Sequence, residues 1–230
     1  MSRTEAAINE VFNSLQGEGI YCGERQTFIR FAGCNIACEY CDSPLALDVS
    51  QAKHYSVDEL VAVVNNFEKP KGVNHSLSLT GGEPLLQVDF LKDFIPAVKK
   101  SVGLPLYLET NGTLPKYLEE IIDLVEIVAM DIKLPSGPEQ QKFLAIAARQ
   151  KVFVKIVVLK ETTAKEIDFA VSLIAAISDA IPLVLQPVTP HGSIKHRPAG
   201  DHLMTLQAVA KRKLKEVRVI PQLHRLLGVS

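Results

Sequence analysis

Short apolar runs alternate with amphipathic stretches along the chain from about residue 27 onward. This alternation predicts β-α units around a mainly parallel sheet. We expect strands at residues 27–31, 76–80, 106–109, 127–131, 152–158, 183–186 and 217–220. We expect helices at residues 56–67, 89–100, 114–123, 139–149, 164–177 and 201–215, the first opened by a capping box of Ser56 and Glu59.

The predicted units are too few for a closed barrel of eight, so we expect an α/β fold, a partial (β/α) barrel of about six parallel strands with an open lateral mouth. No repeat, low-complexity tract or composition break divides the series, which predicts a single domain over residues 1–230. Polar and glycine-rich clusters fall just after the strands, where α/β folds bind their ligands. One shared cavity is therefore expected.

Composition narrows the class of protein. The chain has 230 residues, 47% of them hydrophobic, which is enough for one sizeable core, and its formal net charge of -1 does not favour a nucleic-acid partner. Residues 1–10 carry Arg3, Glu5 and Glu10 and no apolar run, which predicts neither a signal peptide nor a membrane span, and hence a cytoplasmic protein. In that compartment four cysteines indicate metal or redox chemistry rather than disulfides.

Three of the cysteines lie close together in the pattern C-x3-C-x2-C, at Cys34, Cys38 and Cys41. An iron-sulfur cubane held by only three thiolates leaves one iron open for an exogenous ligand. Two alternatives stay open at this point: the three thiols with Cys22 could form a four-thiolate zinc site or a closed electron-transfer cluster. Cys22 by itself is expected to be a small buried hydrophobic residue.

The cysteine pattern resembles the signature of the radical S-adenosylmethionine (SAM) superfamily, with Tyr40 at the aromatic position before the last cysteine. The segment from Thr80 through Gly82 and Glu83 to Pro84 is similar to the Gly-Gly-Glu-Pro segment that binds the SAM amino group in that superfamily. The resemblance implies a radical SAM type of partial barrel, a 4Fe-4S cluster on the three cysteines, and cleavage of SAM to a 5'-deoxyadenosyl radical. The residues that it implies at the SAM site are Tyr40, Asp42, Gly82, Glu83, Asn111, Asp131, Lys133 and Gln186.

Segments outside the common motifs carry a closer resemblance, to the 7-carboxy-7-deazaguanine synthase family. They are residues 12–19, 27–34, 41–43 and 221–224, and the similarity runs from about residue 9 to the C-terminus. The resemblance implies conversion of 6-carboxy-5,6,7,8-tetrahydropterin into 7-carboxy-7-deazaguanine with loss of ammonia, on the route to queuosine and other 7-deazapurines. The radical forms on SAM, so no catalytic side chain is assigned. The residues implied at the substrate are Leu15, Gln16, Gly17, Arg30, Thr80, Glu109 and His224.

The same resemblance implies Mg²⁺ on the hydroxyl of Ser43, where threonine is more usual, a homodimer, and a flavodoxin or ferredoxin as reductant. One departure from the family pattern is the sequence from Asp131 to Lys133, where Ser-Pro-Lys is expected. It is closer to the activating enzymes of glycyl-radical enzymes, which are the alternative within the superfamily.

The remaining histidines and the basic cluster are expected to be structural. We expect surface or capping positions for His54, His75, His191, His196 and His202, because none has paired ligand spacing. The last predicted helix carries Lys211, Arg212, Lys213 and Lys215, which is typical of a solvated face and of charge that complements a helix C-terminus.

Overall fold

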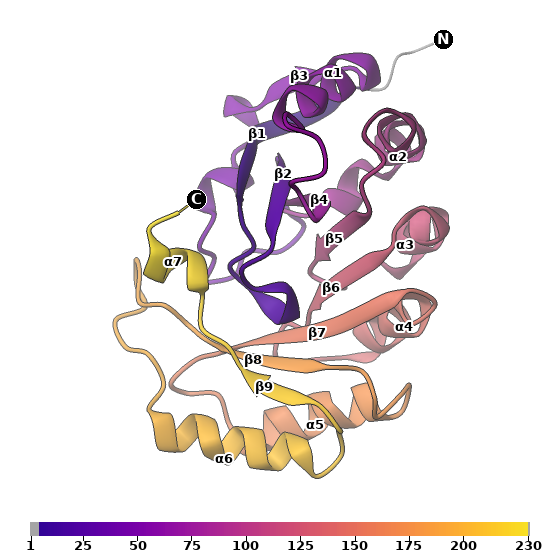
Figure 1. The fold of residues 1–230 in the computed structure, drawn as a ribbon. Helices are drawn as coiled ribbons and strands as arrows, with labels where there is room; N and C mark the ends of the chain where they lie inside the picture. Colours follow the sequence, from indigo (N-terminus) through magenta and orange to yellow (C-terminus); the bar gives the residue numbers. More distant parts are fainter. Residues whose placement is uncertain (1–4, 230) are drawn as a thin grey trace.

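A single curved sheet with helices on its outer face organises the computed structural model, which describes residues 5–229 (Figure 1). The strands are β1 (Ala6–Leu15), β2 (Arg25–Phe31), β3 (Lys53–Tyr55), β4 (Ser76–Gly81), β5 (Leu106–Thr110), β6 (Ile127–Asp131), β7 (Lys151–Val158), β8 (Leu183–Pro187) and β9 (Val217–Val219). Their order in the sheet is β3-β1-β2-β4-β5-β6-β7-β8-β9. Within the described residues the two end strands, β3 and β9, are not paired with each other, so the barrel is open.

The parallel part of the sheet runs from β2 through β4 to β9 in chain order. It confirms the predicted α/β partial barrel, and with the short β9 it contains seven strands rather than about six. The other two strands, β1 and β3, are antiparallel and were not predicted. Residues 12–19 were interpreted only as a family motif. In the structure residues 12–15 form the end of strand β1, and residues 16–19 follow it.

Helices follow the strands at the predicted places. They are α1 (Val57–Phe67), α2 (Val88–Val102), α3 (Pro115–Ile121), α4 (Pro138–Ala147), α5 (Ala164–Ala175) and α6 (Gly200–Lys211). The short α7 (Leu223–Leu227) was not predicted. The capping box that opens α1 is formed as predicted, since Ser56 accepts from the backbone of Glu59 and the Glu59 side chain returns the bond. None of the helices within residues 5–229 is long and apolar enough to cross a membrane.

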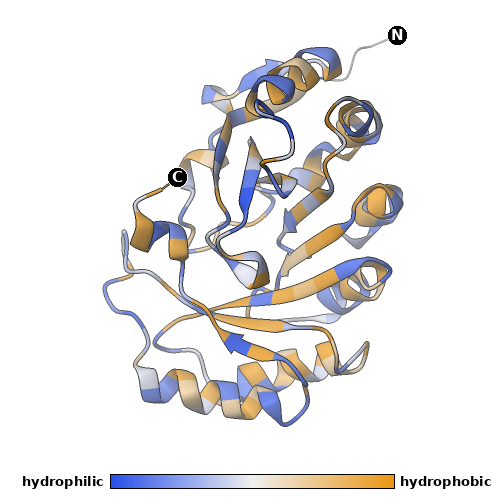
Figure 2. Ribbon diagram, viewed as in Figure 1, coloured by the Kyte–Doolittle hydropathy of each residue, from blue (hydrophilic) through white to orange (hydrophobic). Residues whose placement is uncertain are grey.

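Two apolar clusters fix the sheet. The larger one fills the space between the strands and the outer helices, and Figure 2 shows strands such as β7 and β8 as mainly hydrophobic while polar residues gather on the outer turns and loops. The smaller one lies on the inner face of the sheet, where Tyr107, Phe153 and Val184 pack with Tyr21 of the 3-10 helix η1 (Gly19–Tyr21). Because η1 packs on this inner cluster, one side of the barrel interior is filled and the carboxyl ends of the strands border the open part.

The prediction that residues 1–10 contain no targeting segment rests in part on residues 1–4, which lie outside the described residues. The series of predicted helices and strands is otherwise reproduced with boundaries that shift by a few residues. The largest shift is at the end of the last long helix, because α6 ends at Lys211 and the chain turns through residues 212–216 into β9.

Candidate active site

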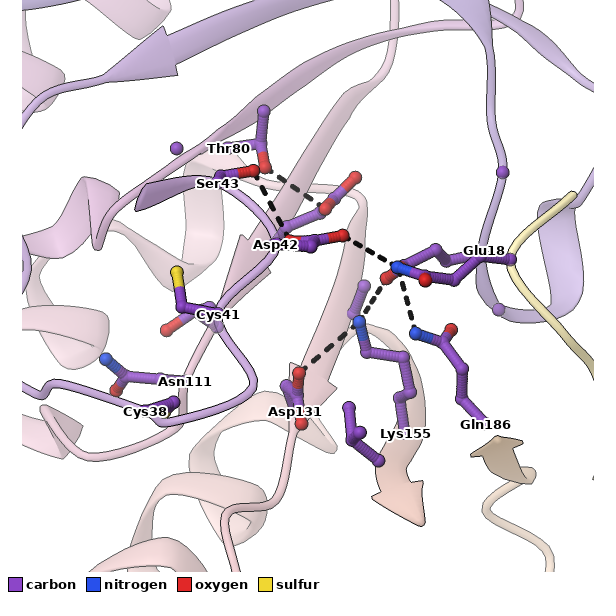
Figure 3. A pocket seen from close by; sticks show the side chains of 18 of the residues that line it. Glu18, Cys38, Cys41, Asp42, Ser43, Thr80, Asn111, Asp131, Lys155 and Gln186 are labelled. Carbon is purple, nitrogen blue, oxygen red and sulfur yellow. Dashed lines mark hydrogen bonds and ion pairs between the residues drawn. The ribbon is translucent and has the colours of Figure 1, made fainter. Parts of the chain in front are cut away.

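A large cavity lies at the carboxyl ends of the parallel strands. It is lined by residues from β1 and β2, from the loop that follows β2, from the ends of β4 to β8, and from the C-terminal segment. Every residue predicted at the SAM, substrate or metal sites lines this cavity except Glu83. Figure 3 shows several of these side chains converging from different strands. The expectation of one shared cavity is therefore confirmed.

Three free thiols, Cys34, Cys38 and Cys41, stand at one end of the cavity. The loop that carries them is tied back on itself, since the amide of Cys41 donates to the carbonyl of Cys38 at 3.1 Å. Soft thiolates are the ligands that iron-sulfur clusters take, and three of them leave one iron without a protein ligand. The donor set in this cavity therefore fits a 4Fe-4S cluster with one open position.

Cys22 does not line the cavity. Burial and the neighbouring Glu18 carboxylate raise the pKa of the Cys22 thiol to about 11, so this side chain stays neutral at physiological pH. A fourth ligand of the same site would have to face the cavity beside the other three thiols. The four-thiolate zinc site and the closed electron-transfer cluster are therefore not favoured among the residues that the structure describes.

The glycine pair after β4 packs directly against the cysteine loop. A Cβ at Gly82 would overlap the carbonyl of Gly33, and Gly81 has a φ of +126°, where a Cβ would strike the backbone of Phe31. The amide of Gly82 donates to the carbonyl of Phe31 at 3.0 Å. Only glycine permits this approach at both positions. The segment predicted to bind SAM and the cysteine loop therefore pack directly against each other.

Glu83 lies behind these two segments rather than in the cavity. Its carboxylate accepts hydrogen bonds from the hydroxyl of Thr110 and from the backbone amides of Leu85 and Asn111, all at 2.8–3.1 Å. Glu83 is fully buried and does not line the cavity, so its predicted place at the SAM site stays a prediction. Glu83 fixes the backbone amide of Asn111, and the side-chain amide of Asn111 lies 3.8 Å from the Cys34 sulfur and 2.9 Å from the side-chain oxygen of Asn35. Asn111 therefore connects Glu83 to the end of the cavity that holds the cysteines.

Burial raises the pKa of Glu83 to about 7, against the opposing effect of the backbone amides that donate to it. The folded protein therefore binds the proton more tightly than the unfolded chain, and stability falls as the pH rises from the unfolded pKa of about 4.5 to the folded value.

We expect wild-type protein to lose roughly 3 kcal/mol of unfolding free energy through this group between about pH 5 and pH 8. In Glu83→Gln that part of the pH dependence is absent. Urea unfolding at the two pH values, without oxygen, measures it; an identical pH dependence in the two proteins would contradict the assignment.

Polar groups at the other end of the cavity form a second cluster. Glu109, at the end of β5, accepts from the amide of Gln16 at 2.9 Å and from the hydroxyl of Thr80 at 3.1 Å. Arg30 lies over the ring of Phe12, at 5.3 Å from its centroid, and its guanidinium is 3.2 Å from the Ser43 hydroxyl. The cavity therefore receives an anionic acceptor from Glu109 and a cationic fork from Arg30.

A row of alternating charges joins the two ends (Figure 3). Lys133 donates to Asp131 at 2.8 Å, the same carboxylate lies 3.3 Å from the ammonium of Lys155, and Lys155 also pairs with Glu18. Lys133 additionally lies over the ring of Tyr40, at 5.3 Å from its centroid. One oxygen of Asp131 and the side-chain oxygen of Gln186 are buried without a hydrogen-bond partner in the described chain. Each is an acceptor that a ligand hydroxyl could satisfy.

Among the cavity residues that sequence reasoning did not assign to a site, four carry polar side chains that tie the cavity together. Glu18, Lys155 and Gln222 form its central network, and His191 was expected at the surface or at a cap. Instead, the two ring nitrogens of His191 lie 2.8 Å from the carbonyl of Thr189 and 3.0 Å from that of Cys41. Its position in the sequence could have indicated this place, because His191 follows the end of strand β8. The other candidate ligand-binding residues were also sought just after strand ends.

One cluster could suggest a cation site of its own. The side chains of Glu18, Asp42 and His224 bring possible ligand atoms within 4.8 Å of one another. Lys155 already neutralises Glu18, and the amide of Gln222 donates to both Glu18 and Asp42. We therefore assign this cluster to the protein's own hydrogen-bond network.

Comparison with known proteins agrees with this geometry. Residues 28–192 match the model of the radical SAM superfamily. A cavity with three cysteine thiols at the strand ends of an open α/β barrel is what this class requires, and the chain belongs to the radical SAM superfamily. The class implies a 4Fe-4S cluster and SAM as cofactors.

Within that class the relatives point to one family. The chain is 40% identical over 252 aligned positions to 7-carboxy-7-deazaguanine synthase from Geobacter sulfurreducens, with 99% of each chain covered. It is 35% identical to the protein of the same name from Methanothermobacter thermautotrophicus, with 97% and 98% covered. The chain belongs to the 7-carboxy-7-deazaguanine synthase family. Its fold is similar to the crystal structure of QueE from Escherichia coli, with a TM-score of 0.65, 21% identity and 96% and 95% of the two chains covered.

Proposed function

We propose that this chain converts 6-carboxy-5,6,7,8-tetrahydropterin into 7-carboxy-7-deazaguanine with loss of ammonia. The observation that carries the proposal is the presence, in one cavity, of three cysteine thiols, the Glu109 carboxylate and the Arg30 guanidinium. The family to which the chain belongs supports the reaction. When bound, the cluster and SAM supply the radical chemistry; the residues of the chain bind and orient the substrate.

Arg30 is suited to the substrate carboxylate. A guanidinium presents two parallel N–H donors that match a carboxylate, and here the Phe12 ring beneath it limits its movement. Its second partner, Glu10, lies 3.5 Å away and is half exposed, so this ion pair gives little competition for the ligand. Arg30 therefore anchors the carboxylate, and with it the carbon at which the reaction begins.

Glu109 is suited to the guanine-like edge of the pterin. The carboxylate accepts one bond from each of Gln16, Ser78 and Thr80, which fixes its plane while leaving acceptor capacity for the substrate. The informative change is Glu109→Gln, because glutamine keeps the shape of the side chain and removes its negative charge. We expect KM for the pterin to rise about 10- to 100-fold, because a charge-assisted hydrogen bond is lost.

The measurement for Glu109→Gln is steady-state turnover under strictly anaerobic conditions. Iron content and 5'-deoxyadenosine formed in the absence of pterin serve as controls, since both depend on the opposite end of the cavity. An unchanged KM would contradict the role of Glu109 in substrate binding.

We propose that Mg²⁺ joins the substrate at Ser43. The Ser43 hydroxyl lies beside Arg30, so a second cation there is favourable only when the substrate carboxylate neutralises both. Mg²⁺ takes few protein ligands and completes its shell with substrate oxygens and water. This arrangement predicts that metal and substrate bind together rather than separately.

We further propose a homodimer, a flavodoxin or ferredoxin as the electron donor, and a cytoplasmic location. The homodimer is supported by exposed apolar side chains near the cavity, since Leu45 is 79% and Leu226 is 73% exposed. The two segments that carry these leucines are linked by a hydrogen bond that Arg225 donates to the carbonyl of Asp42. The cytoplasmic location is supported by four free cysteines, which a reducing compartment preserves. Sedimentation of the holoprotein tests the dimer.

The experiment that tests the function uses protein reconstituted with iron and sulfide without oxygen. After reduction it is incubated with SAM, Mg²⁺ and 6-carboxytetrahydropterin, and the products are analysed by mass spectrometry. The proposal requires 7-carboxy-7-deazaguanine and ammonia, with SAM regenerated. Cleavage of SAM with no deazaguanine product would instead favour a glycyl-radical activating enzyme.

A further inference from the structure

Glu18 accepts hydrogen bonds from three parts of the chain that are far apart in sequence. Gln186 of β8 donates to its carboxylate at 2.9 Å, Gln222 of the C-terminal segment donates at 2.8 Å, and Lys155 of β7 forms an ion pair with it (Figure 3). Nothing in the proposed reaction so far uses this residue. Its position between the strands and the C-terminal segment suggests that it holds them together.

The charge on Glu18 suits it to this task. Burial alone would raise its pKa, but the Lys155 ammonium and the donors on Lys155, Gln222 and Gln186 outweigh burial and lower the pKa to about 2. Glu18 is therefore an anion, and purely an acceptor, throughout the physiological pH range. Hydrogen bonds to a charged acceptor are stronger than those between neutral groups.

The C-terminal segment, residues 221–229, has no apolar anchor of its own. Gln222 is its only buried residue, whereas Leu226 and Leu227 are 73% and 53% exposed. Gln222 donates to Glu18 and, at 2.6 Å, to Asp42, and the amide of Leu223 donates to the carbonyl of Gly17 at 2.8 Å. Polar contacts to residues 17, 18 and 42 therefore hold this segment over the cavity.

The backbone of Glu18 reaches the substrate end of the same cavity. Its amide donates to the side-chain oxygen of Gln16 at 3.0 Å, and this bond turns the Gln16 amide group toward Glu109, 2.9 Å away. The imidazole of His224 lies against Gly17, where a Cβ would overlap the ring. One residue thus contacts both the C-terminal segment and the group that orients Glu109.

We propose that Glu18 is a positioning residue: through Gln222 it holds the C-terminal segment over the substrate end of the cavity, and through its backbone amide it orients Gln16 beside Glu109. The identity of the substrate rests on the proposed function, whereas the contact between Glu18 and the C-terminal segment does not. The two can therefore be tested separately.

The first test follows the C-terminal segment directly. Trypsin cleaves after Arg225, so release of residues 226–230, followed by mass spectrometry of the full-length reconstituted protein, reports how often the segment leaves the cavity. We expect Gln222→Ala and Glu18→Gln each to speed this cleavage about tenfold, because each removes a hydrogen bond to a charged acceptor. Gln222→Ala leaves the ion pair of Glu18 and Lys155 intact, so it keeps the test valid if Glu18→Gln folds poorly.

The second test separates positioning from general stability. In both variants we expect KM for 6-carboxytetrahydropterin to rise about tenfold and kcat to change by less than about threefold, with 5'-deoxyadenosine formation in the absence of pterin retained. A purely structural role would lower the amount of folded protein without changing KM. Met204→Ser, on the exposed side of α6, is the matched control, and both its cleavage rate and its KM should equal those of wild type.

The proposal is overturned if Gln222→Ala keeps the wild-type cleavage rate and KM. It is also overturned if the variants accelerate cleavage while KM stays unchanged, because the segment would then have no effect on substrate. If wild-type protein does not convert the pterin at all, the proposed function fails, and the cleavage experiment alone decides whether Glu18 holds the segment.

Discussion

Replacing Cys38 with alanine is expected to abolish product formation. The three thiols of the cavity are the only cysteines placed to hold the cluster among the described residues, and two thiolates do not retain a 4Fe-4S cubane under turnover. We expect iron to fall from about four per chain to a small fraction of that after anaerobic reconstitution and desalting. Formation of 5'-deoxyadenosine should fall with it, because no electron reaches SAM.

The matched control is Cys22→Ala. Cys22 stands outside the cavity and remains a neutral thiol, so this variant should keep its iron content and its SAM-dependent electron-paramagnetic signal. Loss of the cluster in Cys22→Ala, or its survival in Cys38→Ala, would exclude the three-thiolate site.

Lys155→Met is expected to be the most destabilising of the charge substitutions. Lys155 is only 15% exposed and lies between the carboxylates of Glu18 and Asp131. Methionine fills a similar volume but leaves the buried Glu18 carboxylate without a cation, while Asp131 keeps only Lys133. Breaking a buried pair in this way costs about 3–5 kcal/mol of unfolding free energy.

Urea unfolding of the two proteins at neutral pH measures this loss. The deficit of the variant should shrink as the pH falls, because protonation of the uncompensated carboxylate removes its charge. Lys142→Met is the control: Lys142 pairs with Glu139 on the surface of α4, both side chains are more than half exposed, and removing the pair should cost less than about 1 kcal/mol. Equal losses in the two variants would show that the row of charges is not an important part of the fold.

The parts of the site that could be predicted from sequence are those encoded locally. The three cysteines lie within eight residues, and the glycine pair follows a strand directly, so motif and position can be seen together. The parallel strands could be predicted for a similar reason, because strands buried on both sides appear as continuous apolar runs. In β8, for example, Leu183, Val184 and Leu185 follow one another and all three are buried.

Strand β1 lacks that signal. Only Ala6 and Ile8 of its ten residues are buried, and Asn9, Glu10, Asn13 and Ser14 interrupt any apolar run. Its place is set by pairing with β2 and β3, which are separated from it in sequence. Local pattern could not have found it.

The central network was missed because its members are distant in sequence. Glu18 and Lys155 are 137 positions apart, and Gln222 is 204 positions from Glu18. Taken alone, Lys155 is a polar residue among the apolar positions of strand β7, and nothing in its neighbours shows that it faces two carboxylates. The motif around Glu83 could be found from sequence, whereas the direction of its carboxylate, toward Thr110 and Asn111, could not.

The antiparallel β1 has a consequence for how this enzyme can change. The glycine and cysteine loops, which pack against each other, follow the parallel strands β4 and β2, whereas Leu15, Gln16 and Gly17 lie at the end of the antiparallel β1, beside the edge strand β3. Mutations at that end of β1 can reshape the part of the cavity predicted to bind the pterin while the cysteine loop keeps its geometry. Laboratory evolution toward other heterocyclic acids should therefore begin with a library at residues 12–17 and leave residues 33–41 and 81–83 untouched.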